Sequence, residues 1–586
     1  MVKGIGAAAG IAIGKAFVLP TWEWDMPDEM IDVTDLAKEF ERLYEGIRTS
    51  KDEIEYIKKE ISDVVGYEES NIFDAHLAIL DDPVFMNEIQ GIIQRQYKAA
   101  EVAVKEVIDK FVNMFDLLDD EYMKERALDI KDVGNRLLKH LIGSPEVTLP
   151  ADNQPFILVA KEVSPSQLAH LNPNHVLGIV TMLGGNTSHS AIMARALGIP
   201  LVSGLEGKLR DPIATGDVLI IDGEEGTVYI NPEDELTETY TLRRNRMLAA
   251  ADRLQHLSSV PSLTNDGFPV QLEANISSVK ELELVLKNGA DGIGLFRTEL
   301  LYMDRAQLPS EEEQFTVYQE VVQRMGSRPC IIRTLDIGGD KQLDYFAMPE
   351  EDNPFLGYRA IRICLDQTDL FRTQLRAILR ASAFGNAKIM YPMIASVEEV
   401  RDASRILESV KEELRSEGIP FNADIPVGIM IEVPAAAQIA DVLAEEVDFF
   451  SIGTNDLVQY VLAVDRMNEK IAHLYNPYHP AILRLLHSTV KAAKAKGIPV
   501  GVCGEMAGDI RALPIWLGLG VQELSMSVQS VLKVKEQLIS QHKESCRQLF
   551  EGLLQCRSTA EIQSLLQDYS LTKKEREETD YGVERL

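Results

Sequence analysis

Hydrophobic positions follow three different spacings along the chain, and each spacing predicts a different kind of structure. In residues 1–24 and 145–232 they form short continuous runs between small turns, as in PFILVA, HVLGIVTM and DVLIIDG. Such runs are typical of β-strands in an α/β domain. Neither stretch contains enough strands for a core of its own. We therefore predict one small α/β domain whose two parts are separated in sequence by an insertion.

Residues 25–144 form that insertion. Their apolar residues recur at helical spacing with charged residues between them, which predicts a bundle of antiparallel helices. The block contains 15 Lys and Arg and 29 Asp and Glu, a net charge of −14. This charge is either the solvated face of ordinary helices or a docking surface for a basic partner.

After a polar linker helix at residues 233–260, a strand followed by a helix repeats eight times through residue 571. Apolar strands that alternate with helices are typical of a parallel sheet, and eight such units predict a (β/α)8 TIM barrel. Residues 572–586 lack apolar periodicity and are expected to be a flexible tail. The predicted fold class is multidomain α/β. The eight predicted strands are PVQLEANI, GIGLFRT, PCIIRTLDI, KIMYPMI, PVGIMIEVP, FFSIGTNDL, IPVGVCGEM and ELSMSV.

Net charge, the length of apolar runs and cysteine usage indicate which partners and which compartment fit this chain. With 59 Lys and Arg against 92 Asp and Glu, the net charge is −33, so the molecule repels nucleic acids and anionic membranes. No apolar run is as long as a membrane span, and the glycine-diluted start reads better as a strand than as a signal peptide. Five scattered cysteines without a C-x-x-C pair fit a reducing cytoplasm.

His189 occupies a position suited to carrying a phosphate. It follows a strand-like run, a Gly184-Gly185 turn and two N-capping residues, Thr187 and Ser188, while Gly198 supplies the helix stop. Backbone N–H groups and the positive end of the dipole at a helix start favour an anion. A histidine near a helix start is most often a cap or surface residue, so this position alone does not assign a function.

Polar and charged residues cluster at the predicted strand ends of the barrel, where such barrels build their active sites. Arginines bind phosphate or carboxylate in a bidentate manner. Glu432 and Asp456, from adjacent strands, offer the hard oxygen ligands preferred by Mg²⁺, with Mn²⁺ as the alternative metal. The full set is Asn275, Arg297, Arg333, Asp336, Met393, Glu432, Asn455, Asp456 and Cys503.

Several segments resemble the motifs of the phosphoenolpyruvate-utilising enzymes: GGNTSHSAIMARALGIP, GLFRTELLYM, RTLDIGGDK, NPFLGYRAIR, GIMIEVP, SIGTNDL and GVCGEM. The order of domains is similar to that of the family members that serve the bacterial sugar phosphotransferase system, over about residues 1–570. The resemblance implies that His189 carries the phosphoryl group and that Cys503 is an acid. It also implies that Glu432 and Asp456 bind the metal. The residues that it implies for substrate binding are Arg297, Arg333, Asn455, Asp456 and Arg466, assisted by Arg359.

The same resemblance implies a reaction. Phosphoenolpyruvate would phosphorylate His189, pyruvate would leave, and a histidine of a small phosphocarrier protein docked on the acidic block would receive the phosphoryl group. A cytoplasmic homodimer associated through the barrel is also implied. Asn186 departs from the family, which usually has arginine there. A thiol with the ordinary pKa of about 8.5 is mostly protonated at neutral pH, so Cys503 can serve as a proton donor, and Arg297 and Arg333 nearby could lower that pKa.

Two other functions fit parts of the sequence. A synthase or dikinase of the same family would need a large ATP-binding domain, for which the chain has neither room nor a G-x-x-x-x-G-K-[ST] loop. A metal-dependent barrel lyase acting on keto acids explains Glu432 and Asp456, with the front half as an interaction module. It leaves GGNTSHS without a role.

Overall fold

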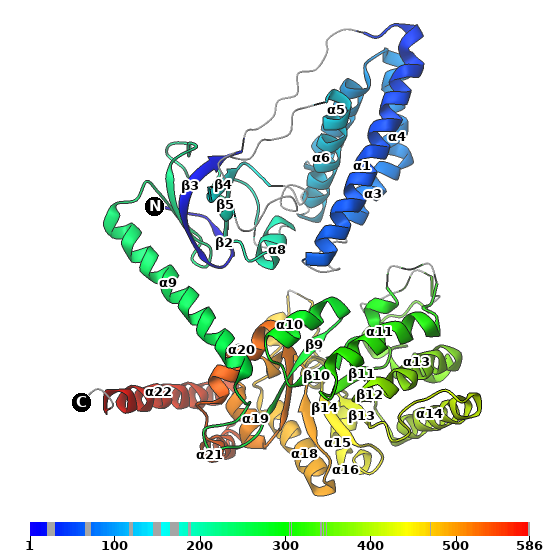
Figure 1. The fold of residues 1–586 in the computed structure, drawn as a ribbon, viewed down its shortest axis with the longest axis vertical. Helices are drawn as coiled ribbons and strands as arrows, with labels where there is room; N and C mark the ends of the chain where they lie inside the picture. Colours follow the sequence, from blue (N-terminus) through cyan, green and yellow to red (C-terminus); the bar gives the residue numbers. More distant parts are fainter. Residues whose placement is uncertain are drawn as a thin grey trace. The chain divides into compact units, whose positions relative to one another are not determined.

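The chain folds into two compact units, Met1–Ala250 and Ala251–Leu586 (Figure 1). The structure is a computed structural model. It describes residues 1–19, 30–64, 72–116, 121–143, 154–163, 175–185, 189–303, 305, 307–339, 343, 345–346, 348–468 and 470–583.

The first unit is built on a mixed eight-stranded sheet. Its strand order is β1-β8-β7-β3-β4-β5-β6-β2. Strand β3, before the insertion, pairs in parallel with β4, after it, so the two sequence-distant parts complete one sheet. The strands are β1 (Val2–Lys3), β2 (Ile5–Ala8), β3 (Ile11–Val18), β4 (Phe156–Ala160), β5 (Val176–Thr181), β6 (Leu201–Ser203), β7 (Val218–Asp222) and β8 (Thr227–Ile230).

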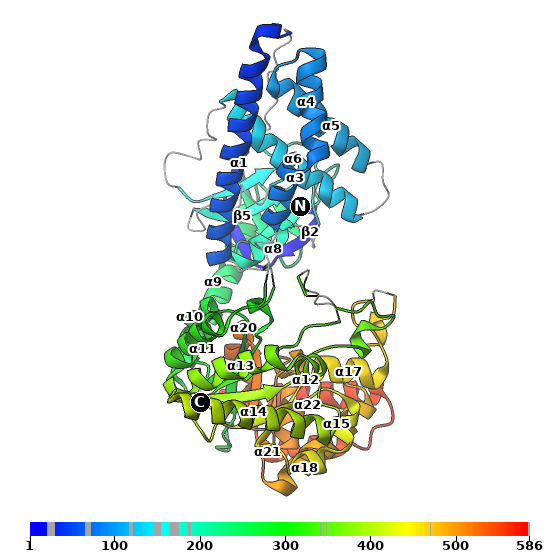
Figure 2. The ribbon, with the colours of Figure 1, turned by 90° about the vertical axis from the view of Figure 1, so that its right-hand side faces the viewer.

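Between β3 and β4, the described part of the chain contains five α-helices, which lie side by side (Figure 2). They share a continuous apolar core with one face of the sheet, because residues such as Ile54 and Val104 belong to the same buried cluster as Leu158. Arg136 and His140 hold Glu53 at 2.8 and 2.7 Å and so fasten α6 to α1. The helices are α1 (Leu36–Val64), α3 (Ile72–Asp81), α4 (Pro83–Gln96), α5 (Ala100–Asp116) and α6 (Glu121–Ile142), preceded by η1 (Val33–Asp35).

The second unit is a closed barrel of eight parallel strands, which confirms the predicted fold class. All eight predicted runs contain a strand. Around the barrel the order is β10-β11-β12-β13-β14-β15-β16-β9, so each strand neighbours the next in sequence. The strands are β9 (Gln271–Ile276), β10 (Gly292–Phe296), β11 (Cys330–Arg333), β12 (Ala387–Tyr391), β13 (Val427–Ile431), β14 (Phe449–Ile452), β15 (Val500–Val502) and β16 (Glu523–Ser527).

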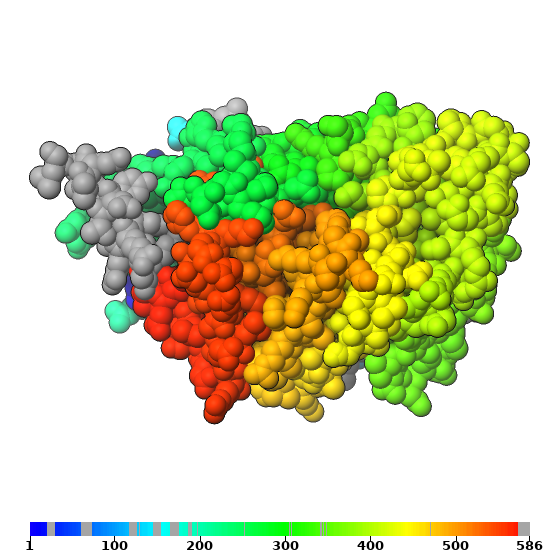
Figure 3. All heavy atoms as spheres, turned by 90° about the horizontal axis from the view of Figure 1, so that it is seen from below, coloured from blue at the N-terminus to red at the C-terminus, as the bar shows by residue number. Residues whose placement is uncertain are grey.

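Helices cover the outside of the barrel. In Figure 3 the colour of the second unit passes from green through yellow and orange to red, since segments that follow one another in sequence are neighbours on the surface. The helices are α10 (Leu282–Lys287), α11 (Glu311–Met325), α12 (Ile361–Asp366), α13 (Thr368–Ala381), α14 (Val397–Glu417), α15 (Pro434–Gln438), α16 (Ala440–Leu443), α17 (Thr454–Leu462), α18 (Pro480–Lys496), α19 (Leu513–Leu519), α20 (Val528–Leu538), α21 (Lys543–Leu553) and α22 (Thr559–Val583). Short 3-10 turns are η3 (Val279–Glu281), η4 (Glu299–Leu301), η5 (Pro354–Leu356), η6 (Ser382–Phe384), η7 (Ala472–Leu474) and η8 (Glu505–Ala507).

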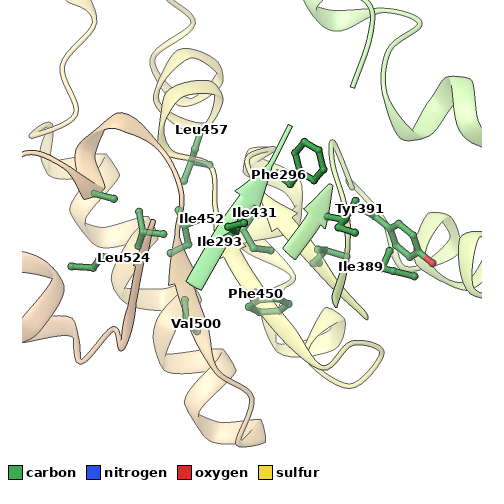
Figure 4. Close-up of a cluster of buried hydrophobic side chains, with 14 of the residues drawn as sticks. Ile293, Phe296, Ile389, Tyr391, Ile431, Phe450, Ile452, Leu457, Val500 and Leu524 are labelled. Atoms are coloured by element: carbon green, nitrogen blue, oxygen red, sulfur yellow. The ribbon is translucent and has the colours of Figure 1, made fainter. Parts of the chain in front are cut away.

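The main core lies between the strands and these helices. Side chains such as Ile293, Ile389 and Ile431 point outward from the strands into it (Figure 4). Phe296 packs edge-on against Tyr318 of α11, with ring centroids 5.9 Å apart. This apolar layer stabilises the packing of the helices on the barrel. The ends of the strands lie outside it and can carry polar residues.

Two segments differ from the sequence prediction. The run FFSIGTNDL was predicted as a strand, but β14 ends at Ile452 and α17 begins at Thr454, because Gly453 turns the chain. The stretch predicted as a flexible tail continues α22 to Val583, since its Lys, Glu and Arg residues are good helix formers. The predicted linker lies largely in α9 (Asp234–His256), followed by η2 (Leu257–Ser259). Of the helices that the structure describes, none could span a membrane.

A buried carboxyl group inside the barrel gives a first testable prediction. Glu273 of β9 is fully buried, and Gly292 and Gly294 of β10 leave the space that its carboxyl oxygens occupy. Burial, together with the nearby Glu523 carboxylate, raises the pKa of Glu273 well above its ordinary value. The folded state therefore holds a proton that the unfolded chain releases near pH 4.5. Stability contributed by this proton decreases as pH rises, by up to about 1.4 kcal/mol per pH unit until the folded pKa is passed.

Glutamine is neutral and has the same shape as glutamate. We therefore expect Glu273→Gln to remove this decrease of folding stability with rising pH. Between pH 5 and 9 the thermal midpoint of the variant should fall less than that of the wild type, as followed by calorimetry. Glu283→Gln, at an exposed position of α10, is the control and should follow the wild type. Parallel pH profiles for Glu273→Gln and the wild type would show that Glu273 is ionised in the folded protein.

Candidate active site

The site is built at the carboxyl ends of the barrel strands, where parallel strands deliver their last residues to one rim. Arg333 is the last residue of β11, Glu432 directly follows β13 and Cys503 directly follows β15. Arg297 directly follows β10 and is exposed. The structure thus brings side chains from strands far apart in sequence to a single surface of the barrel.

Two buried arginines and three buried carboxylates form the centre of the rim. Arg333 contacts Glu299 and lies 2.9 Å from Asp336. Arg359, from the loop before α12, lies 3.1 Å from Asp336 and 2.8 Å from Asp456. Each of these five side chains belongs to a residue exposed by no more than 9%. A buried charge needs a partner, so the arginines and carboxylates hold one another in place.

Glu432, one of the two proposed metal ligands, is 2% exposed. One of its oxygens accepts a 2.6 Å hydrogen bond from the Met393 backbone N–H, and Met393 has the unusual positive φ of 57°. Burial and the neighbouring carboxylates of Asp456 and Asp336 raise the pKa of Glu432 to about 8. Carboxylates that repel each other in this way fit a divalent cation, because the cation would neutralise both.

Cys503 lies at the inner end of the site among apolar side chains and is 3% exposed. Its Sγ donates to the Ile452 carbonyl at 3.7 Å. Burial raises the pKa of its thiol to about 11, and the nearby positive charges of Arg333 and Arg297 only partly oppose this. The two arginines act in the direction that the sequence indicated, but desolvation outweighs them and the net shift of the pKa is upward. With its pKa raised in this way, the thiol keeps its proton at neutral pH and is available as a proton donor.

The remaining predicted residues are half-buried. Asn455 is in the first turn of α17 and exchanges two hydrogen bonds with Glu505, at 2.9 and 3.0 Å. Arg466 follows α17, and its backbone N–H donates to the Gln459 side chain at 3.2 Å. Asn275 donates to the Cys503 carbonyl at 3.0 Å and so supports the loop that carries the thiol.

Sequence reasoning missed two residues of this site. Glu299 lies in the segment GLFRTELLYM, two residues after Arg297, but nothing in its spacing indicates that it pairs with Arg333. Tyr460 lies one helical turn after Asp456, and its hydroxyl contacts Arg359 at 3.2 Å. The i, i+4 spacing on α17 was the available signal for Tyr460.

His189 is the first residue of α8 (His189–Ala196), in the first unit. Gly184 and Gly198 on either side both have positive φ, of 101° and 69°, as expected for the turn before this helix and for its stop. The described part of the structure does not include the predicted caps Thr187 and Ser188 or the His189 side chain. It also does not include Asn186, where the family usually has arginine. The backbone therefore places His189 at a helix start in a different unit from the barrel rim.

A (β/α)8 barrel with charged residues at the carboxyl ends of its strands is the arrangement in which barrel enzymes build their active sites. The family models described as PEP-utilising enzyme match the whole order of domains: N-terminal over residues 3–126, mobile domain over 152–226 and PEP-binding domain over 251–543. The chain belongs to the family of PEP-utilising enzymes.

Two curated relatives agree with this assignment. The phosphoenolpyruvate-protein phosphotransferase of Bacillus subtilis (strain 168) is 47% identical over 97% of this chain and 99% of that protein. The protein of the same name from Geobacillus stearothermophilus is 47% identical over 96% of this chain and 97% of that protein. An NMR structure of an Enzyme I (nEIt) protein is 36% identical and covers 42% of this chain and 99% of that one, with a TM-score of 0.36.

Proposed function

We propose that this enzyme transfers the phosphoryl group of phosphoenolpyruvate to His189 and then to a histidine of a small phosphocarrier protein, releasing pyruvate. This is the first step of a sugar phosphotransferase system. The observation that carries the proposal is the rim, where Arg333 and Arg359 lie beside the carboxylates of Glu432 and Asp456. Two arginines match the phosphate and carboxylate groups of this substrate.

Phosphoryl transfer depends mainly on alignment and on neutralisation of charge. Arg297, Arg333 and Arg466, with Asn455 and assisted by Arg359, would orient the phosphate and carboxylate. Glu432 and Asp456 would hold Mg²⁺ or Mn²⁺, which when bound supplies neutralisation of negative charge.

His189 would then attack phosphorus in line. The bond between phosphorus and the enol oxygen breaks, the electron pair stays on that oxygen, and an N–P bond forms. Cys503 Sγ gives its proton to the enolate carbon, so that pyruvate forms, and water reprotonates the thiolate. Because His189 belongs to another unit, a movement of that unit must precede and follow transfer.

The other partners belong to the same proposal. The acidic helical block, residues 25–144, would dock the phosphocarrier, with charge complementarity setting mainly the rate of encounter. The enzyme would act as a cytoplasmic homodimer associated through the barrel. Its charge argues against nucleic acid as a partner.

The test is to incubate the protein with phosphoenolpyruvate labelled in the phosphate, with Mg²⁺. We expect one acid-labile label per chain, release of an equal amount of pyruvate, and loss of the label to added phosphocarrier. A barrel lyase would leave the protein unlabelled, and that result would overturn the proposal.

The assignment of Cys503 as the acid gives a separate prediction. Cys503→Ala should fold and bind phosphoenolpyruvate but form pyruvate about 10²–10⁴ times more slowly, which is the usual contribution of a general acid. Pyruvate release in the presence of phosphocarrier is the measurement. Cys556→Ala, between α21 and α22, is the control and should behave as wild type. If Cys503→Ala forms pyruvate at the wild-type rate, the proton comes from another group.

A further inference from the structure

One guanidinium group, that of Arg359, bridges two of the rim carboxylates. Its Nε and Nη2 lie 3.1 and 3.4 Å from the two oxygens of Asp336, and Nη2 also lies 2.8 Å from Oδ2 of Asp456. Asp456 is one of the two proposed metal ligands. The positive charge that satisfies Asp456 in this structure is thus supplied by the protein itself.

The surroundings of Arg359 hold the guanidinium in this position. The Tyr460 hydroxyl accepts a hydrogen bond from Nη1 at 3.2 Å and donates its own proton to the Phe355 carbonyl. The Phe355 ring lies 5.8 Å from the guanidinium carbon. The backbone is restricted as well, because Ala360 has a φ of 54° and a side chain on Gly338 would meet the Arg359 Cβ. The restricted backbone and the contacts of the guanidinium group therefore both keep Arg359 against the two carboxylates.

A divalent cation and a guanidinium compete for the same buried carboxylate. Arg359 and Asp456 are both at least nine-tenths buried, so repulsion between a cation on Asp456 and the nearby guanidinium is weakly screened. If the guanidinium leaves Asp456, it can stay paired with the carboxylate of Asp336. The Tyr460 hydroxyl is neutral and cannot compensate for a second positive charge.

We propose that Arg359 is an internal counter-ion that a divalent cation must displace from Asp456, and that Tyr460 is the positioning residue that holds Arg359 there. This inference rests on the proposed metal site at Glu432 and Asp456. Arg359 then lowers the affinity of the free enzyme for metal. After displacement from Asp456 the guanidinium would stay attached to Asp336, where an incoming phosphate can bind it.

The test is binding of Mn²⁺ alone to the full chain, without phosphoenolpyruvate, followed by electron paramagnetic resonance of the free ion. Arg359→Gln removes the competing charge, so its Mn²⁺ dissociation constant should fall about tenfold relative to the wild type. Tyr460→Phe loosens the guanidinium without removing it and should give a smaller decrease. Arg372→Gln removes the same charge from the ion pair with Glu413 between α13 and α14 and should leave Mn²⁺ binding unchanged.

Unchanged or weaker Mn²⁺ binding in Arg359→Gln would overturn the inference. Asp456→Asn is measured beside it and should bind Mn²⁺ much more weakly than the wild type. If Asp456→Asn binds as the wild type does, the proposed metal position is wrong and this inference falls with it. Because no phosphoryl transfer occurs in these measurements, their outcome is independent of whether His189 becomes phosphorylated.

Discussion

Replacing His189 with alanine should reduce labelling by phosphoenolpyruvate to background. The imidazole is the only group of this chain that we propose to form the N–P bond, so its loss removes the nucleophile. His189 begins α8, and the positive end of the helix dipole there favours the phosphate that it would carry. The measurement is radioactivity retained by the protein after rapid mixing with labelled substrate and Mg²⁺.

Two controls make this result specific. His256→Ala, at an exposed position of α9, should be labelled as the wild type is. Circular dichroism of His189→Ala should match the wild type, since the change lies at a helix terminus. Label on His189→Ala at one equivalent per chain would show that another residue accepts the phosphoryl group.

Asp456→Asn should slow metal-dependent phosphorylation by two or more orders of magnitude. The amide keeps the shape of the side chain but removes one of the two charges that would hold Mg²⁺ or Mn²⁺. It also removes a carboxylate partner of Arg359, which lies 2.8 Å away. Both effects weaken the charge arrangement needed for transfer. The initial rate of labelling across a range of Mg²⁺ concentrations is the measurement.

An exposed aspartate provides the comparison. Asp441→Asn, on α16, changes the same charge away from the rim and should keep the wild-type rate. Excess metal should recover part of the rate in Asp456→Asn if Glu432 still binds it. An unchanged rate and an unchanged metal dependence in Asp456→Asn would exclude Asp456 as a metal ligand.

The sequence was sufficient for elements whose ends are set by local interactions. One such element is helix α11, which spans Glu311–Met325 because the Ser310 and Glu313 side chains cap its start and Gly326 follows its end. The eight barrel strands were visible as apolar runs because parallel strands are buried on both faces. The order of those strands also predicts that Arg333, Glu432 and Cys503 lie at one rim.

Where a local signal was incomplete, the sequence reading failed. The run FFSIGTNDL is apolar enough to be taken as one strand, yet Asn455 and Asp456 lie on a helix. Gly453 is the residue at which the chain turns, and a Cβ there would meet Met430 and Glu432. The need for glycine at that position comes from the neighbouring strand, which local sequence does not show.

The sequence by itself determined the barrel, the inserted helical bundle, the helix start at His189 and the chemical types at the rim, because apolar periodicity and capping residues act over a few positions. Tertiary structure alone decided which charge pairs with which. The attachment of Arg359 to Asp456 joins residues 97 positions apart, and that of Arg333 to Glu299 joins residues 34 apart. It also decided the protonation of Cys503, since burial by surrounding strands raises its pKa to about 11 whereas adjacent arginines in isolation would lower it.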